Sequence, residues 1–600
     1  MTTPRRTSRR AAPPRAVFWR RRALLLLVPL LLCAGAVVLL RGDGGEAERV
    51  ALGRAYVRAW QHGDYAAMHA LLTPAARRAT PAARFAHLHR TALRIATAPR
   101  IGPADDVSAS EHAVRLRLRV PTHAFGSVAA TLTLPLDDGD APRVRWSPQL
   151  VFPGLRHGER LSARTRLAPR ASLLAADGSV LAAGPERAPD AAVADVAGQT
   201  VGVLGEPEPA RLLALQARGV PSTAAVGLNG LERALDDRLT GTPGGELLAG
   251  RRVLAQRLPS APAAVTTTIV PSVVRAAADA LAGRPGGAVA VDPRDGAVLG
   301  FAGTPFSGLG PPGSTFKILT LVAALESSAA TEESTYPYEQ QALLGGAPLQ
   351  NANGERCGGT LVESFAHSCN SVFAPLGVAA GPQRLAAVAE RFGFNAPSDL
   401  GGAATSAFPA TGSDDDPLAV GSNAIGQGKV VASALQMASV ATTIARDGVR
   451  PRLTVDAAAA PAPPRRATTP AVARVVQRAM RAVVEDGTGG AAAIDGVPVA
   501  GKTGTAELRA TQTCPPEEVE AGTCTDEDDP TDTDAWFVAY APAGGGGGDD
   551  DGDTPRVAVG VVLSGSGAGG ETAAPVAREL LLAALAQQDD GDGPAPQPDR

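Results

Sequence analysis

Residues 23–40, ALLLLVPLLLCAGAVVLL, form an apolar run without a charged side chain. At about 1.5 Å per residue, a helix of this length just spans the hydrocarbon core of a bilayer. Residues 1–22 before it contain eight arginines and no acid. Because positive flanks stay in the cytoplasm, we expect a transmembrane signal anchor that leaves the chain after Arg41 outside the cytoplasm.

A cleaved signal peptide is the alternative interpretation of this run. Ala34, Gly35 and Ala36 offer the small residues of a cleavage site. The apolar run continues to Leu40, which favours a retained anchor. Both interpretations place the remaining chain on the outer side of a cell membrane.

Two segments after the anchor have mixed α+β character. Residues 46–155 combine apolar residues at helical spacing with alternating runs typical of half-buried strands. Residues 160–262 contain a hairpin that turns at Asp177-Gly178, followed by a helix that ends in a Gly-rich loop within 226–245. A generic α+β linker domain is the plainest interpretation of the second segment.

Residues 266–588 form the largest predicted domain. They begin with a strand and a helix, and they end with an amphipathic helix at 571–588. Further predicted strands, including one hairpin, lie at 286–303, 534–542 and 556–565. We expect an antiparallel sheet flanked by helices, an all-helical stretch between about 314 and 490, and a disordered tail at 589–600.

Arginine supplies almost all of the positive charge. The formal net charge is −3, so the composition indicates no nucleic-acid partner. The three lysines are Lys317, Lys429 and Lys502. Lysine can lose its proton and arginine cannot. The few lysines in a chain that otherwise uses arginine are therefore candidates for a role that requires deprotonation.

The first motif is Ser314-Thr315-Phe316-Lys317. Pro311-Pro312-Gly313 interrupts structure before it, and ILTLVAALE continues after it as a helix. Residues three apart share a helix face, so the lysine amine can reach the serine hydroxyl. Lysine can activate a serine if burial lowers its pKa. An ordinary helix with a solvated lysine is the alternative.

The second motif is Ser368-Cys369-Asn370. In a turn between helices, residues two apart can face one cleft, where a hydroxyl can relay a proton and an amide can hold a peptide group. Serine and asparagine are also frequent helix caps, which is the alternative interpretation here.

The third motif is Lys502-Thr503-Gly504-Thr505, within a strand-like run. Gly504 would let a ligand backbone approach closely, and a backbone N–H beyond it could donate to an oxyanion. Lys502 and the two threonine hydroxyls can bind a carboxylate. A strand end with an exposed lysine is the alternative.

The three motifs occur in the order typical of penicillin-interacting enzymes. The chain therefore resembles a class B penicillin-binding transpeptidase. That resemblance implies a serine β-lactamase/transpeptidase-like fold for 266–588. Residues 160–262 resemble the pedestal, or dimerisation, domain of that family. Residues 46–155 resemble the nuclear-transport-factor-like domain found at the front of some members.

The resemblance also implies roles for the motif residues. Ser314 would be the acylated nucleophile, Lys317 its base and Ser368 a proton relay. Asn370 would hold the substrate peptide. The terminal carboxylate would lie against Lys502, Thr503 and Thr505, and the N–H groups of Ser314 and Thr505 would form an oxyanion hole. Lys429, after GQG, is predicted to be a surface residue.

Cysteine and histidine offer less chemistry. Cys514 and Cys524 bracket a loop after the third motif, and we expect a local disulfide there. For Cys357 and Cys369, the sequence does not decide between a disulfide and buried free thiols. Seven of the eight histidines precede residue 160, so neither a Ser-His-Asp triad nor a metal site is expected, and no cofactor is implied.

The expected activity is peptidoglycan D,D-transpeptidation through a serine acyl-enzyme, with stem peptides as substrates and β-lactams as inhibitors. A D,D-carboxypeptidase or β-lactamase-type hydrolase is the enzymatic alternative. A β-lactam sensor or a scaffold for cell-division or elongation proteins is the non-enzymatic one. A bifunctional glycosyltransferase is disfavoured, because 41–265 has no recognisable glycosyltransferase.

Overall fold

The computed structural model describes residues 45–139, 141–410, 412, 416–507, 533–544 and 554–591. The predicted anchor at 23–40 and the cysteines Cys514 and Cys524 lie outside these residues. Within them, no single helix is both long enough and apolar enough to cross a bilayer. One pair of consecutive helices, Asn370–Ala380 and Pro382–Arg391, reaches that length and composition together but bends by 96°.

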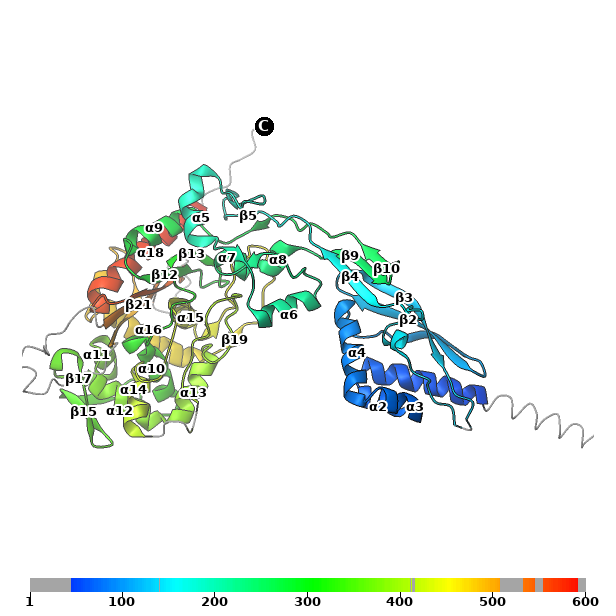
Figure 1. Cartoon of the computed structure of the whole chain (residues 1–600). Coiled ribbons are helices and arrows are strands. Elements are labelled where there is room, and N and C mark those ends of the chain that lie inside the picture. The colour runs from blue at the N-terminus through cyan, green and yellow to red at the C-terminus, as the bar shows by residue number, and fades with distance from the viewer. Residues whose placement is uncertain are drawn as a thin grey trace, which may run out of the picture. The chain divides into compact units, whose positions relative to one another are not determined.

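Contacts divide the chain into two compact units. The first comprises Met1–Ala168, Glu208–Ser222 and Thr242–Ser260, and the second comprises Pro169–Pro207, Thr223–Gly241 and Ala261–Arg600. The predicted segment 160–262 therefore contributes strands and helices to both units. Figure 1 shows the elements of each unit.

Helices open the first unit. The helix at 45–61 stops before Gly63, whose positive φ of 69° suits glycine, and Asp64 then caps the next helix by accepting from the Ala67 N–H. This is the break that the sequence predicts. The remaining helices of the unit are α2 Tyr65–Ala70, α3 Pro74–Ala79, α4 Ala82–Ile95 and α6 Pro209–Ala217.

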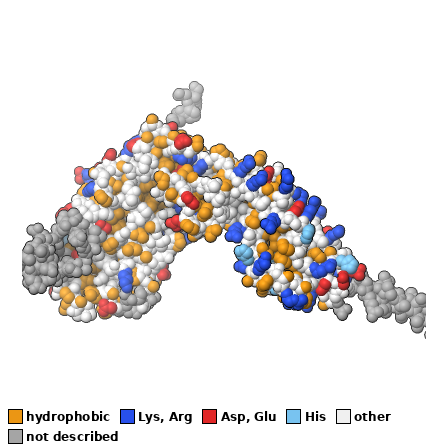
Figure 2. All heavy atoms as spheres, viewed as in Figure 1, with side chains coloured by type: hydrophobic (Ala, Val, Ile, Leu, Met, Phe, Trp, Pro, Cys, Tyr) orange, Lys and Arg blue, Asp and Glu red, His pale blue; other side chains and the backbone are white. Residues whose placement is uncertain are grey.

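Two antiparallel three-stranded sheets complete the first unit. One has the order β1-β2-β3, and the other has the order β10-β9-β4. The residues of β2 are alternately buried and exposed, as its sequence predicts. Basic side chains are spread over the visible face of this unit (Figure 2). The strand bounds are β1 Ala104–Ala109, β2 Ala113–Thr122, β3 Gly126–Pro135, β4 Leu161–Arg166, β9 Gly244–Ala249 and β10 Arg252–Arg257.

The segments Pro169–Pro207 and Thr223–Gly241 of the second unit contain buried or largely buried charged side chains. Glu232 is 1% exposed and accepts from the Nε groups of Arg170 and Arg187, each at 2.6 Å. Arg170 also pairs with Asp236 at 2.7 Å. The helix predicted within 226–245 is split into two short helices at Leu235. The elements are β5 Leu173–Leu174, β6 Val180–Ala182, α5 Ala194–Thr200, β7 Leu204–Gly205, β8 Val226–Gly227, α7 Gly230–Ala234, α8 Asp236–Thr240 and β11 Val265–Thr266.

The second unit is built on a five-stranded antiparallel sheet in the order β13-β12-β22-β21-β20. The predicted hairpin at 286–303 is confirmed, since Val289 pairs with Phe301. The third motif pairs with β21, where Thr503 lies opposite Phe537. The strands are β12 Gly286–Val291, β13 Val298–Gly303, β20 Ala500–Glu507, β21 Thr533–Ala541 and β22 Val557–Leu563.

Helices cover both faces of this sheet (Figure 1). Trp536 and Val538 of β21 belong to the core that includes α15, Ala434–Ala445. The alternating residues Phe537 and Ala539 belong to the core that includes α9, Pro271–Leu281, and α18, Gly569–Gly591. Successive side chains of a strand point to opposite faces, so β21 is buried almost throughout. The predicted covering helix is confirmed and runs to Gly591, into the segment predicted to be a disordered tail.

The prediction that the stretch 314–490 is all-helical is wrong: helices are its main regular elements, but short strand pairs and irregular segments lie between them. Its helices include α10 Lys317–Glu326, α11 Leu361–Ala366, α12 Asn370–Ala380, α13 Pro382–Arg391, α14 Pro417–Ala424 and α16 Pro470–Glu485. Short strand pairs interrupt them: β14 Thr335–Glu339 with β17 Cys357–Thr360, β15 Gln341–Leu344 with β16 Ala347–Gln350, and β18 Val449–Arg450 with β19 Arg465–Arg466. Gly345 and Gly346 both have positive φ, which is the conformation of a two-residue hairpin turn.

Candidate active site

The first motif lies at the start of a buried helix, as predicted. Gly313–Phe316 forms a 3-10 turn that leads directly into α10. Gly313 has a φ of 52°, and a side chain there would meet the backbone oxygen of Thr505 at 2.7 Å. Glycine therefore lets the Ser314 turn pack closely against the third motif. Ser314 itself is half-buried.

Lys317 lies fully buried behind Ser314. Its Nζ donates to the Ser368 carbonyl oxygen at 2.6 Å, to the Asn370 Oδ1 at 2.6 Å and to the Ser368 Oγ at 3.1 Å. Burial, and secondly the charge of Lys502, lower the pKa of Lys317 well below its ordinary value. Among the described residues, Nζ makes no hydrogen bond to Ser314, so the predicted contact between the two stays a prediction.

The second motif occupies the turn between α11 and α12. Ser368 has a φ of 59°, which is uncommon for a residue with a side chain. The helix-cap interpretation fails here, because the cap position of α12 is Cys369 and it makes no side-chain capping bond. Asn370 instead spans two partners, since its Oδ1 accepts from Lys317 and its Nδ2 donates to the Gln350 carbonyl at 2.8 Å.

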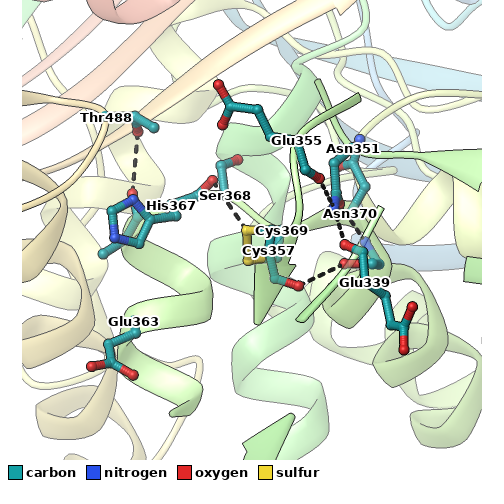
Figure 3. The surroundings of a disulfide bond; sticks show 12 residues. Glu339, Asn351, Glu355, Cys357, Glu363, His367, Ser368, Cys369, Asn370 and Thr488 are labelled. Atoms are coloured by element: carbon teal, nitrogen blue, oxygen red, sulfur yellow. Dashed lines mark hydrogen bonds between the residues drawn. A yellow bond between two sulfur atoms is a disulfide. The ribbon is translucent and has the colours of Figure 1, made fainter. Parts of the chain in front are cut away.

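A disulfide joins Cys357 of β17 to Cys369, the middle residue of the second motif (Figure 3). The structure thus decides between the two states that the sequence leaves open. The bridge connects the loop that carries Ser368 and Asn370 to the short sheet β14–β17. The pairing predicted for Cys514 and Cys524 falls outside the described residues and stays a prediction.

The third motif lies on the edge strand β20 of the central sheet. Lys502 is fully buried, and its Nζ donates to the carbonyl oxygen of Thr503 at 3.3 Å and to its Oγ1 at 3.4 Å. Burial lowers the pKa of Lys502 to about 7. Thr505 is exposed, whereas Thr503 is 6% exposed.

Gly504 packs against the chain itself. A Cβ at this position would meet the Pro312 oxygen at 2.7 Å, the Trp536 Cβ at 2.9 Å and the Thr315 Cγ2 at 3.0 Å. The space that glycine leaves is therefore filled by the protein's own turn before Ser314 and by β21, and the predicted approach of a ligand backbone stays a prediction. This close packing fixes β20 against the start of α10.

Two further polar residues at the site have no signal in a single sequence. The Asn351 Nδ2 donates to the carbonyl oxygens of Glu339 and Glu355, and its Oδ1 accepts from the Ser371 N–H, so it ties a surface segment to α12 (Figure 3). The Thr488 Oγ1 lies 2.7 Å from the Thr503 Oγ1. Both contacts join segments that are distant in sequence.

Lys429 and the buried His89 are two further ionisable residues of the chain. Lys429 is exposed, as predicted. His89 is buried among aromatic rings, and burial lowers its pKa to about 3. In the part of the chain that the structure describes, no group of three or more His, Cys, Asp or Glu side chains is arranged to hold a metal ion.

A helix-borne serine, a buried lysine and a Lys-Thr-Gly edge strand on this sheet define a site of the serine β-lactamase/transpeptidase class. Residues 286–582 match the family described as penicillin binding protein transpeptidase domain. The chain is 33% identical over 423 residues to peptidoglycan D,D-transpeptidase PbpA of Mycolicibacterium smegmatis, covering 60% of this chain and 80% of that protein. It is 32% identical over 296 residues to PbpA of Mycobacterium tuberculosis, covering 46% of this chain and 55% of that protein.

Solved structures agree with these sequence matches. A D,D-transpeptidase domain from Eggerthella lenta superposes with a TM-score of 0.53 and 28% identity, covering 70% of this chain and 99% of that one. PBPA from Mycobacterium tuberculosis superposes with a TM-score of 0.50 and 27% identity, covering 69% and 99%. The chain belongs to the penicillin-binding protein transpeptidase family.

Proposed function

We propose that this protein is a class B peptidoglycan D,D-transpeptidase that uses Ser314 as its nucleophile. The relatives above carry that activity in their names. The observation that carries the proposal for this chain is the environment of Lys317. A fully buried lysine with a lowered pKa, held by the second motif at the base of the Ser314 turn, is suited to act as a base.

The reaction has two acyl-transfer steps. In the first, the Ser314 Oγ attacks the carbonyl carbon between the two terminal D-Ala residues of a stem peptide, and Lys317 takes the hydroxyl proton. The C–N bond then breaks, the proton passes to the leaving amine through Ser368, and D-Ala departs. In the second step, an amine of a neighbouring stem peptide attacks the acyl-enzyme, forms the cross-link and returns the proton to Ser314.

The other motif residues would bind the substrate. The N–H groups of Ser314 and Thr505 would donate to the developing oxyanion, which is worth about 10²–10³-fold in rate for one donor in serine hydrolases. The Lys502 ammonium, supported by the Thr503 Oγ1 that accepts from it, would hold the terminal carboxylate together with the Thr505 hydroxyl, and Asn370 would hold the peptide backbone. β-Lactams would acylate Ser314, as ceftriaxone acylates the Mycobacterium tuberculosis relative.

The proposal extends to the cellular setting. Residues 23–40 would anchor the protein in the cell membrane, with residues 1–22 in the cytoplasm and the catalytic domain outside, where peptidoglycan is made. We propose a nuclear-transport-factor-like fold for 46–155, supported by the helices at 45–95 and the sheet β1-β2-β3 that follows. Cell-division or elongation proteins are candidate partners.

A labelled penicillin tests the nucleophile. The ectodomain, starting after Arg41, should form a stable adduct whose tryptic peptide carries the label on Ser314. Ser314→Ala should abolish the adduct, whereas Ser327→Ala, which changes a half-buried serine whose hydroxyl donates to the Ala323 carbonyl near the end of α10, should leave it intact. A folded ectodomain that forms no adduct would reject the enzymatic proposal and favour a scaffold.

A second assay separates cross-linking from hydrolysis. The ectodomain is incubated with a D-Ala-D-Ala donor peptide and an amine acceptor, and products are resolved by mass spectrometry. A transpeptidase gives the cross-linked product. Release of D-Ala with the hydrolysed donor alone would instead support the D,D-carboxypeptidase alternative.

A further inference from the structure

Thr488 lies in the turn after α16 and contacts two segments of the active site, the loop that carries the second motif and the strand that carries the third. Its N–H and its Oγ1 donate to the Ala366 carbonyl oxygen at 3.2 Å and 3.3 Å. Its Oγ1 also lies 2.7 Å from the Thr503 Oγ1 of the third motif. Ala366 ends α11, two residues before Ser368, and Figure 3 shows Thr488 beside this loop. Thr488 therefore bridges the second motif loop and the β20 strand.

The turn that carries Thr488 is firmly placed. Gly489 N–H donates to the Val483 carbonyl at 2.8 Å, which folds the turn back onto α16. A Cβ at Gly487 would meet the Ala366 oxygen at 2.4 Å, so the turn packs directly against the second motif loop. These contacts hold the backbone of Thr488 in place, and the Thr488 hydroxyl is then oriented by its own contacts to Ala366 and Thr503.

Hydrogen-bond counting gives this bridge a direction. In its charged form, which is the form that binds a carboxylate, Lys502 can only donate, so the Thr503 Oγ1 then accepts from it. The single Thr503 hydroxyl proton then needs another acceptor, which the Thr488 Oγ1 supplies. The Thr488 proton in turn is taken by the Ala366 carbonyl. The hydrogen bonds thus form a chain in which each group donates to the next: Lys502 to Thr503, Thr503 to Thr488, and Thr488 to the Ala366 carbonyl.

We propose that Thr488 is a positioning residue for carboxylate recognition: its hydroxyl keeps the lone pair of Thr503 turned toward Lys502 and so holds the Lys502 ammonium in place for the terminal carboxylate. The inference rests on the proposed function, in which Lys502 binds that carboxylate. Without the Thr488 hydroxyl, the Thr503 proton loses this acceptor, so the Thr503 hydroxyl can rotate and turn its proton, in place of its lone pair, toward the Lys502 ammonium.

The test compares two donors that differ only at the carboxylate. One is a thiolester that ends in a free carboxylate, and the other is its methyl ester. In Thr488→Val, which keeps the shape but removes the hydroxyl, acylation of Ser314 by the carboxylate donor should fall by about 10-fold or more, through a higher KM. Acylation by the methyl ester should stay within about twofold. Thr488→Ser should restore most of the loss.

Thr443→Val serves as the matched control, because its buried hydroxyl bonds only within α15, to the Ser439 carbonyl at 2.7 Å. It should change neither donor's rate. An equal loss on both donors in Thr488→Val, or no loss on either, would overturn the inference. Failure of the unchanged protein to acylate would instead reject the proposed function, and the inference with it, so the two failures are distinguishable.

Discussion

Removing the Cys357–Cys369 disulfide should destabilise the second motif and slow acylation. The bridge joins residues with a sequence separation of 12. In the chain-entropy relation, a loop of this size contributes about 3 kcal/mol to the free energy of unfolding. Cys369 also stands between the two residues whose oxygens hold Lys317, so we expect Cys357→Ser/Cys369→Ser to reduce the second-order rate of acylation by about 10-fold, the order of losing one hydrogen bond to a charged group.

The assay uses the ectodomain in a Cys514→Ser/Cys524→Ser background, which leaves Cys357 and Cys369 as its only cysteines. Labelled penicillin gives the rate of acylation, and denaturant titration gives the free energy of unfolding, each with and without reductant. The background variant under oxidising conditions is the control. Reductant should reproduce the effect of the two serine substitutions, and it should do nothing further once those serines are present.

Two results would refute this reasoning. If stability falls and the acylation rate does not change, the bridge stabilises the fold without positioning Ser368 and Asn370. If acylation becomes faster, the bridge holds the motif in a less productive place. The first result would mean that the contacts of Lys317 are set by the helices alone, and the second that the bridge acts on them in the opposite direction to the one expected.

Three further predictions follow from single residues. Glu232→Gln removes the buried carboxylate that accepts from Arg170 and Arg187, of which Arg170 keeps a second carboxylate partner, Asp236. The free energy of unfolding should therefore fall by about 3–5 kcal/mol in denaturant titration, and a loss below about 1 kcal/mol would contradict the buried pairing. Gly504→Ala places a Cβ 2.7 Å from the Pro312 oxygen, so penicillin acylation should drop at least about 10-fold; an unchanged rate would show that β20 can shift freely. Burial lowers the pKa of Lys502 to about 7, so above that pH the folded state binds fewer protons than the unfolded one. The free energy of unfolding should therefore rise with pH between about 7 and 10, until the unfolded lysine also loses its proton. Because the pKa of Lys317 is lowered as well, Lys502→Met should reduce that rise in melts across this range without removing it, and an unchanged rise would contradict the reasoning.

Local pattern was sufficient for many elements of the fold. Alternation or helical spacing within one segment predicts each of three elements: the hairpin at 286–303, the strand pair β2–β3 and the covering helix α18. The all-helical prediction for 314–490 failed, because short strand pairs in a region of long helices carry little periodicity. The Gly345-Gly346 turn was the one local signal that could have found the β15–β16 hairpin.

The sequence by itself determined the chemistry of the site. Ser314 with Lys317, Ser368 with Asn370, and the Lys502 motif are each readable within four residues, and their order along the chain indicates acyl transfer through serine. Those features are local, since spacing on a helix or a strand follows from backbone geometry alone.

Only the tertiary structure decided how these residues meet. It showed that Lys317 bonds to the second motif, that Cys357 pairs with Cys369, and that Gly504 makes room for the chain's own turn. It also brought Thr488 to Thr503. Each of these is a contact between segments separated along the chain, and such contacts arise from the packing of helices onto the central sheet, which no local spacing encodes.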